Sequence, residues 1–107
     1  MRKGGVALII AALFSISAIE AADHSVEPIV SRIQRGPVQS SALATVGYSK
    51  RLHALEIEFR DGLTYRYLGV SQETYRAFIE ANSKARYYNQ HIRGRYRCLR
   101  VKPRHAR

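Results

Sequence analysis

Two short runs of alternating residues, 55–59 and 63–67, constrain the fold of this chain more than any other feature. Each run alternates apolar and polar side chains, which is the period of a strand with one buried face. A two-residue turn between them would put the apolar face of one strand opposite the polar face of the other. A three-residue loop with Gly62 at positive φ instead places Phe59 opposite Leu63. The predicted hairpin buries one face, made of Leu55, Ile57, Phe59, Leu63, Tyr65 and Tyr67.

The same register pairs the polar residues on the other face of the hairpin. Glu56 falls opposite Arg66, and Glu58 falls opposite Thr64. Two carboxylates at this spacing suggest a general acid and a general base. A cross-strand ion pair between Glu56 and Arg66 explains the pattern with fewer requirements. We therefore favour a structural interpretation over a catalytic one.

Further strands are expected on both sides of this hairpin. An earlier strand, beginning after Val38, would carry on one face Ala42, Ala44, Val46 and Tyr48. A last strand is expected over residues 96–101, with Leu99 and Val101 on one face.

Two helices are expected between the hairpin and the last strand. Ser71 is a favourable N-cap, and the helix that it begins should end near residues 82–83. Its apolar face has helical spacing and consists of Tyr75, Phe78 and Ile79. A second short helix over residues 86–92 would present Tyr88 and Ile92 to the core. The order is β-β-β-α-α-β, which predicts an α+β domain with a small antiparallel sheet packed by one or two short helices.

The N-terminus has the features of a secretory signal peptide. Arg2 and Lys3 precede an apolar stretch over residues 6–19, and Ala21 and Ala22 follow it. This stretch is shorter than the roughly 20 residues of a membrane span. We expect cleavage after Ala21 or Ala22 and a periplasmic or secreted protein, with an uncleaved anchor as the alternative. The predicted division is a signal peptide over 1–21, a linker or extended arm over 22–37, the domain over 38–101 and a disordered basic tail over 102–107.

Positive charge is concentrated at the C-terminal end of the chain. Residues 84–107 contain nine Lys or Arg and no Asp or Glu, whereas residues 22–83 carry no net charge. A local excess of this kind is typical of a surface that binds anions. Because Arg93, Arg95 and Arg97 alternate, an extended segment would point them to one side. The candidate polyanion-binding residues are Lys84, Arg86, Arg93, Arg95, Arg97, Arg100, Lys102 and Arg104. The candidate stacking residues are Tyr87, Tyr88 and Tyr96.

Residues for catalysis or metal binding are sparse in this sequence. Cys98 has no partner within the chain, so it predicts either a buried thiol or an intermolecular disulfide. The four His residues show no metal-ligand spacing, and Ser40-Ser41 lies outside any nucleophile motif. We expect no enzymatic activity, no cofactor and no metal site.

An ordered set of short motifs runs through residues 38–101. They are Ser40-Ser41, Val46-Gly47-Tyr48, Phe59 with Gly62, Tyr65-Arg66-Tyr67, Tyr75 with Phe78, Ala81 through Ser83-Lys84, Tyr87-Tyr88-Asn89, and His91-Ile92-Arg93 with Tyr96. In this order they resemble the KTSC domain, a module found at the C-terminus of some lysyl-tRNA synthetases and in stand-alone bacterial proteins. The family's most recognisable motif is the central Tyr-x-Tyr, here Tyr65 and Tyr67. The resemblance implies no established catalytic activity or cofactor, and the link to a tRNA-charging enzyme suggests contact with RNA.

Two residues depart from the family's pattern. Ala85 stands where a Gly commonly follows the Ser-Lys pair. If that position has positive φ, Ala85 would be strained by about 1 kcal/mol and the junction between the helices would differ. Cys98 stands where an aromatic residue is common, so the last strand is expected to pack differently.

Two functions are consistent with these observations. The first is a non-catalytic, exported module that binds polyanions, either nucleic acid or anionic envelope polymers, through the basic C-terminal segment. The second is a protein-interaction or inhibitor module that docks an acidic partner or adds a partner strand to a free sheet edge. A solvated basic face above core tyrosines is the structural alternative to both.

Overall fold

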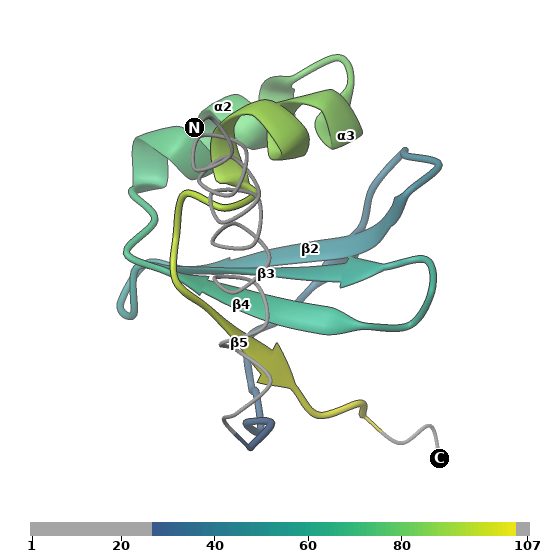
Figure 1. The fold of residues 1–107 in the computed structure, drawn as a ribbon. Helices are drawn as coiled ribbons and strands as arrows, with labels where there is room; N and C mark the ends of the chain where they lie inside the picture. The colour runs from purple at the N-terminus through teal and green to yellow at the C-terminus, as the bar shows by residue number, and fades with distance from the viewer. Residues whose placement is uncertain (1–26, 105–107) are drawn as a thin grey trace, which may run out of the picture.

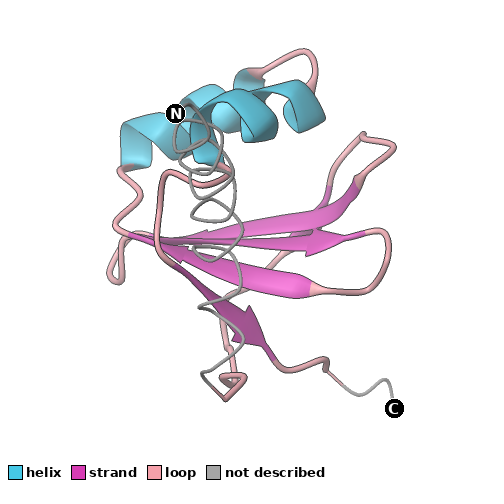
Figure 2. Cartoon of the chain, in the orientation of Figure 1, coloured by secondary structure: helices cyan, strands magenta, loops and turns pink. Residues whose placement is uncertain are grey.

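The computed structural model describes residues 27–104, which form a five-stranded antiparallel sheet with all helices on one face (Figures 1 and 2). The elements, in chain order, are β1 (Gly36–Pro37), β2 (Leu43–Ser49), β3 (Ala54–Phe59), β4 (Thr64–Leu68), α2 (Gln72–Glu80), α3 (Lys84–Tyr87), the π-helix η2 (Tyr88–Ile92) and β5 (Cys98–Val101). The strands neighbour one another in sequence order, from β1 to β5. The predicted α+β class is confirmed, and the order differs by the short strand β1, which the sequence did not predict. The predicted signal peptide lies outside the described residues, and no helix within residues 27–104 has the length and apolar character of a membrane span.

The central hairpin has the predicted register. β3 and β4 pair Leu55 with Tyr67, Ile57 with Tyr65 and Glu56 with Arg66. Gly62 has a φ of 95°, as the three-residue loop requires. The loop is closed by a hydrogen bond of 2.9 Å from the Phe59 amide to the Leu63 carbonyl. The alternation of side chains and one glycine therefore sufficed to define this hairpin.

The first predicted strand exists, but its buried face differs from the prediction. Val46 and Tyr48 lie opposite β3 residues of the core face, as expected. The register shifts between Leu43 and Thr45, so a β-bulge moves Leu43, and neither Ala42 nor Ala44, into the core. The prediction for Ala42 and Ala44 was wrong because strict alternation does not allow for the extra residue of a bulge.

Serine hydroxyls begin both α-helices. Ser71 accepts a hydrogen bond from the Thr74 amide at the start of α2, as predicted. Ser83 accepts one from the Arg86 amide at the start of α3, which continues directly into η2. Ala85 lies inside α3, and its φ is not positive. The conformation that would strain an alanine is absent at this position, and the junction between the helices consists of the residues around the Ser83 cap.

The last strand begins two residues later than predicted. Residues 93–95 form a turn in which Gly94 has a φ of 72°. The Arg93 amide donates to the Tyr88 carbonyl and the Arg95 amide donates to the Ile92 carbonyl. The segment is therefore a turn and not a strand, so the alternation of its arginines does not place them on one side.

The apolar core lies between the sheet and the helices. Its buried side chains are Leu43, Val46, Leu55, Ile57, Tyr67, Val70, Phe78 and Ile92. Tyr88 packs against this cluster from η2, and Ile92 is fully buried in it, as predicted. Each large apolar side chain buried in this way contributes roughly 1.5–3 kcal/mol to stability.

The opposite face of the sheet is covered by residues 29–37, which we call the strap. The strap runs along the side of the sheet away from the helices (Figure 1). It begins with a parallel bridge between Ile29 and Val101 and ends in β1, which pairs with β2. Ile33 is buried within it. The sequence predicted a linker or extended arm here, and the described part is an extended segment bound to the domain.

The strap explains why Glu56 is fully buried and does not face solvent as the sequence suggested. Glu56 accepts from Arg35 of the strap at 2.7 Å and from Arg66 at 2.8 Å. The expected ion pair between Glu56 and Arg66 is present, with a second guanidinium added. Gly47 allows the strap to approach this closely, because a Cβ there would overlap the Gln34 carbonyl oxygen.

Candidate polyanion-binding surface

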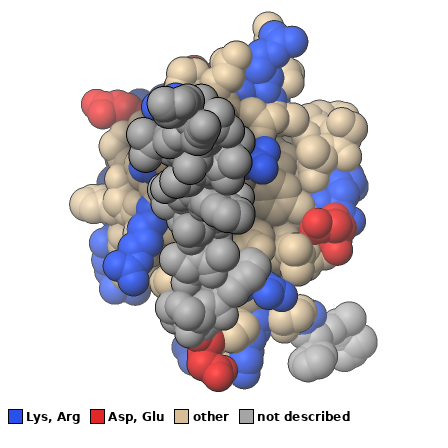
Figure 3. Space-filling model, viewed as in Figure 1, with Lys and Arg blue, Asp and Glu red and all other residues tan. Residues whose placement is uncertain are grey.

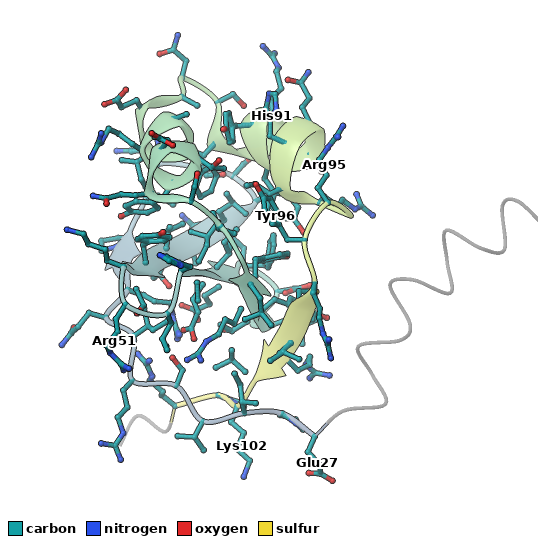
Figure 4. All side chains as sticks on the ribbon, turned by 90° about the vertical axis from the view of Figure 1, so that its left-hand side faces the viewer. Glu27, Arg51, His91, Arg95, Tyr96 and Lys102 are labelled. Carbon is teal, nitrogen blue, oxygen red and sulfur yellow. The ribbon has the colours of Figure 1, made fainter. Side chains whose placement is uncertain are left out.

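Four of the predicted basic residues lie on α3 and on the segment that leads from the helices into β5. Arg86 lies on α3, and Arg93, Arg95 and Arg97 lie on the following turn and its exit. We call these four residues the basic turn. All four side chains are exposed, and Figure 4 shows Arg95 beside the helix layer, away from the sheet. Both ion pairs found among the described residues belong to Glu56, so none of these four arginines forms an ion pair with an acidic side chain there.

The other four predicted basic residues do not join the basic turn. The Lys84 ammonium donates to the Ala81 carbonyl at 3.0 Å, and Arg100 is partly buried in β5. Lys102 is exposed at the far end of the molecule from Arg95 (Figure 4). Arg104 Nη2 donates to the carbonyls of Ser31 and Ile33 at 3.1 and 2.8 Å, so this residue of the expected tail holds the strap. In Figure 3, too, Lys and Arg lie on separate parts of the visible face.

The three predicted stacking tyrosines are largely used in packing. Tyr87 lies between Phe78 and His91, with ring centroids 5.7 and 4.4 Å away. The Tyr88 and Tyr67 hydroxyls share a hydrogen bond of 2.7 Å. Tyr96 packs against the core cluster beneath the helices. Of the three, Tyr88 also lines a cavity.

This cavity, which we call the aromatic pocket, lies between the hairpin loop and the helix formed by α3 and η2. It has a volume of about 300 Å³. Phe59, Tyr65 and Tyr88 supply aromatic wall, and the remaining lining consists of Ala42, Leu43, Asp61, Leu63, Ala85, Asn89 and Arg93. Arg93 thus belongs both to the pocket and to the basic turn.

Sequence reasoning missed this pocket because its walls come from three separate segments. It assigned Phe59 and Tyr65 to the buried face of the hairpin. In the structure the opening is marked by Leu63, which alternation placed on the buried face and which is 37% exposed at the end of the hairpin.

The remaining polar groups of the domain serve its structure. The Thr45 hydroxyl donates to Glu58, and Arg35 Nε donates to the Thr45 hydroxyl, which extends the network around Glu56. The Tyr48 hydroxyl donates to the Val70 carbonyl at 2.7 Å. Burial raises the pKa of Tyr48 above its usual value of 10.0, so this hydroxyl keeps its proton to a higher pH than an exposed tyrosine.

Cys98 is partly buried in β5 and packs against the core cluster from that strand. Within residues 27–104, no three His, Cys, Asp or Glu side chains meet as metal ligands.

The KTSC domain family matches residues 39–96 of this chain. The chain belongs to the KTSC domain family. This region includes the hairpin, both α-helices, the aromatic pocket and three of the four residues of the basic turn. The strap and β5 lie outside it. The family's central Tyr-x-Tyr motif lies in β4, where Tyr67 is buried and Tyr65 lines the pocket.

Relatives of this KTSC protein support the same assignment. A protein of Stutzerimonas stutzeri, named as uncharacterized, is 39% identical over 70 residues, covering 64% of this chain and 99% of its own length. A protein of Tsukamurella paurometabola is 33% identical over 63 residues, covering 59% of this chain and 94% of its own length. The crystal structure of a KTSC domain protein from Yersinia pestis is 39% identical and superposes with a TM-score of 0.63, covering 65% of this chain and 99% of that one. Membership assigns a fold of uncharacterised function and no reaction.

Proposed function

We propose that this chain is an exported, non-catalytic KTSC protein that binds polyanions through the basic turn. The observation that carries the proposal is the exposure of four arginines that lack an acidic partner within the described part of the chain. A guanidinium group without an ion-pair partner has its forked N–H donors available for a phosphate or sulfate oxygen. The polymers of this class are nucleic acids and the anionic polymers of the cell envelope.

The export part of the proposal is supported by the N-terminal sequence. A basic start followed by an apolar stretch over residues 6–19 is the pattern that the secretion machinery recognises. Export restricts the partners to polymers outside the inner membrane. Mass spectrometry of the protein from its own envelope fraction should find an N-terminus at Ala22 or Asp23. An intact Met1 form spread through the cytosol would contradict this part.

The non-catalytic part is supported by the state of the paired carboxylates. Both oxygens of Glu56 are held by guanidinium groups, and the side chain is fully buried. Glu58 accepts from the Thr45 hydroxyl. A general acid or base must reach its substrate, and Glu56 is closed off by the strap.

Docking of an acidic protein partner is the second candidate, and the sheet edges restrict how it would occur. β1 is two residues long and contains Pro37, which lacks an amide donor. At the other edge, the strap residue Ile29 accepts from the Lys102 amide and donates to the Arg100 carbonyl. Both features disfavour the addition of a partner strand, so an acidic protein would dock on exposed basic side chains and not on a sheet edge.

A fluorescence-anisotropy titration tests the proposal. The purified protein is titrated against labelled heparin, duplex DNA and single-stranded RNA at physiological ionic strength. We expect binding to at least one polymer with a Kd of about 10⁻⁴–10⁻⁶ M, the usual range for charge-driven association. Absence of binding to all three in this range would overturn the proposal and favour the protein partner, whose binding would be saturable and stoichiometric.

A charge-matched pair of variants locates the site. One variant carries Arg93→Ser, Arg95→Ser and Arg97→Ser. The control carries Arg32→Ser, Lys50→Ser and Arg51→Ser, three exposed cations away from the basic turn. The first variant should lose most of the affinity and the control should retain it. Equal losses would show that net charge, and not this surface, drives binding.

A further inference from the structure

The aromatic pocket has the size and the walls of a site for one ring system. At about 300 Å³ it lies at the small end of ligand pockets, which span roughly 300–1,000 Å³. Phe59 meets Tyr65 and Tyr88 edge to face, with interplanar angles of 70° and centroid distances of 6.3 and 5.3 Å. All three of these rings line the pocket.

Small side chains keep this space open. Ala85 faces the pocket from α3, and Ala42 borders it from the segment before β2. Leu63 lies at its edge and is 37% exposed. An exposed leucine beside an aromatic cavity offers apolar contact area to a ligand.

Three polar side chains line the pocket: the carboxylate of Asp61, the carboxamide of Asn89 and the guanidinium of Arg93. Asp61 Oδ1 accepts from the Leu63 amide at 3.0 Å, which leaves its other carboxylate oxygen for a ligand. Asn89 offers a carboxamide, and Arg93 offers an exposed guanidinium. A simple anion would meet the negative charge of Asp61, whereas a ring with both donors and acceptors on its edge would find partners on Asp61 and Asn89.

We propose that the aromatic pocket receives an unstacked base of a single-stranded nucleic acid, with Arg93 at the neighbouring phosphate. This inference rests on the proposed polyanion binding and names the polymer class. Aromatic side chains stack on any base, and single strands present bases that a duplex hides. Because Arg93 belongs to the pocket and to the basic turn, a chain that places a base in the pocket brings its phosphate backbone to the basic turn. Heparin, which has no bases, would use the arginines alone.

Filling the pocket without changing its charge tests the inference. Ala85→Leu puts a larger side chain into the pocket at a position where leucine is a good helix former. The matched control, Ala77→Leu, makes the same change at an exposed position of α2 that does not line the pocket. Loss of one stacked base should weaken binding of a short single-stranded oligonucleotide by about fivefold or more. Affinity for heparin should be unchanged in both variants.

The outcomes separate this inference from the function on which it rests. If Ala85→Leu leaves oligonucleotide affinity unchanged, or lowers heparin affinity equally, the base-binding inference is wrong while polyanion binding stands. If the unaltered protein binds no polymer, the proposed function itself fails. Circular dichroism checks that Ala85→Leu is folded, and Ala42→Leu fills the same pocket from an exposed position if it is not.

A second readout uses a single nucleotide as the probe. Adenosine monophosphate should shift the NMR signal of the Asn89 side-chain amide, whereas ribose 5-phosphate, which lacks the base, should not. Equal shifts with both probes would mean that only the phosphate is recognised, and would overturn the assignment of a base to this pocket.

Discussion

The two faces of the sheet are built from different chemistry. The helix face is apolar and aromatic, and it opens at the end of the hairpin into the aromatic pocket. The strap face contains a buried carboxylate between two guanidinium groups, held beneath an extended segment. One face is therefore stabilised by burial of apolar area. The other combines burial of Ile33 with charge pairing that requires every partner.

This difference separates the roles of the arginines. Arg35 and Arg66 are bound to Glu56, and Arg104 is bound to strap carbonyls. The basic turn lies at the end of the helix layer, without such partners within the described residues. The number of positive charges is thus a poor guide to which of them can bind a polymer.

The largest loss of stability is expected from a substitution on the helix face of the sheet. Ile57→Asp places a charge without a partner in the centre of the core and should prevent folding. Leu63→Asp is the control, because it changes the same face at its exposed end. Circular dichroism should show a folded Leu63→Asp protein and an unfolded Ile57→Asp protein. Similar melting temperatures for the two would contradict the assignment of this face.

The second-largest loss of stability is expected on the strap face, when the carboxylate of Glu56 is removed. Glu56→Gln leaves two largely buried guanidinium groups without their charge partner, at a cost of about 3 kcal/mol in the free energy of unfolding. Glu58→Gln keeps an acceptor for the Thr45 hydroxyl and should cost below about 1 kcal/mol. Chemical denaturation measures both. An equal cost would mean that Glu56 is not the centre of this face.

A smaller loss of stability is expected where the strap lies closest to the sheet. Gly47→Ala adds a Cβ that overlaps the Gln34 carbonyl, so the strap must shift, at about 1–3 kcal/mol. Gly36→Ala on β1 meets no atom within 4 Å and serves as the matched control. If Gly47→Ala and Gly36→Ala have the same stability in thermal melts, the strap does not pack as described.

The smallest loss of stability is expected where Arg104 contacts the strap. Arg104→Ser removes the guanidinium that donates to Ser31 and Ile33, and should cost about 0.5–1 kcal/mol because the side chain is exposed. Hydrogen exchange at the Ile33 amide should become faster. Polymer binding should change little, and a loss as large as that of the basic-turn variant would place Arg104 in the binding surface.

The hairpin could be predicted because its signal is local. Alternation and Gly62 determine which residues face each other within thirteen residues of chain. Ser71 likewise indicates the start of α2 from local sequence, because its side chain caps the helix. The strap was missed as a packed element because its apolar residues are scattered between Pro28, Gly36 and Pro37. Its position depends on Gly47 and Glu56, which lie far along the sequence.

The sequence shows which basic residues the candidate site could use, but it does not show where the fold places them. The acid-free segment was visible in the sequence, but the turn at Gly94 and the separation of Lys102 and Arg104 from Arg95 depend on the tertiary fold. The aromatic pocket joins Phe59, Tyr65 and Tyr88 from two strands and η2. Periodicity assigned the first two of these rings to the core, because it cannot detect that the core is open at one end.

The salt dependence of binding tests the central claim most directly. The logarithm of the affinity for duplex DNA is plotted against the logarithm of salt concentration for the unaltered protein and the two charge-matched variants. Each lost phosphate contact makes the slope shallower by about 0.9. The account predicts a shallower slope for the variant that replaces Arg93, Arg95 and Arg97, and an unchanged slope for the variant that replaces Arg32, Lys50 and Arg51. Equal slopes for the two variants would contradict it.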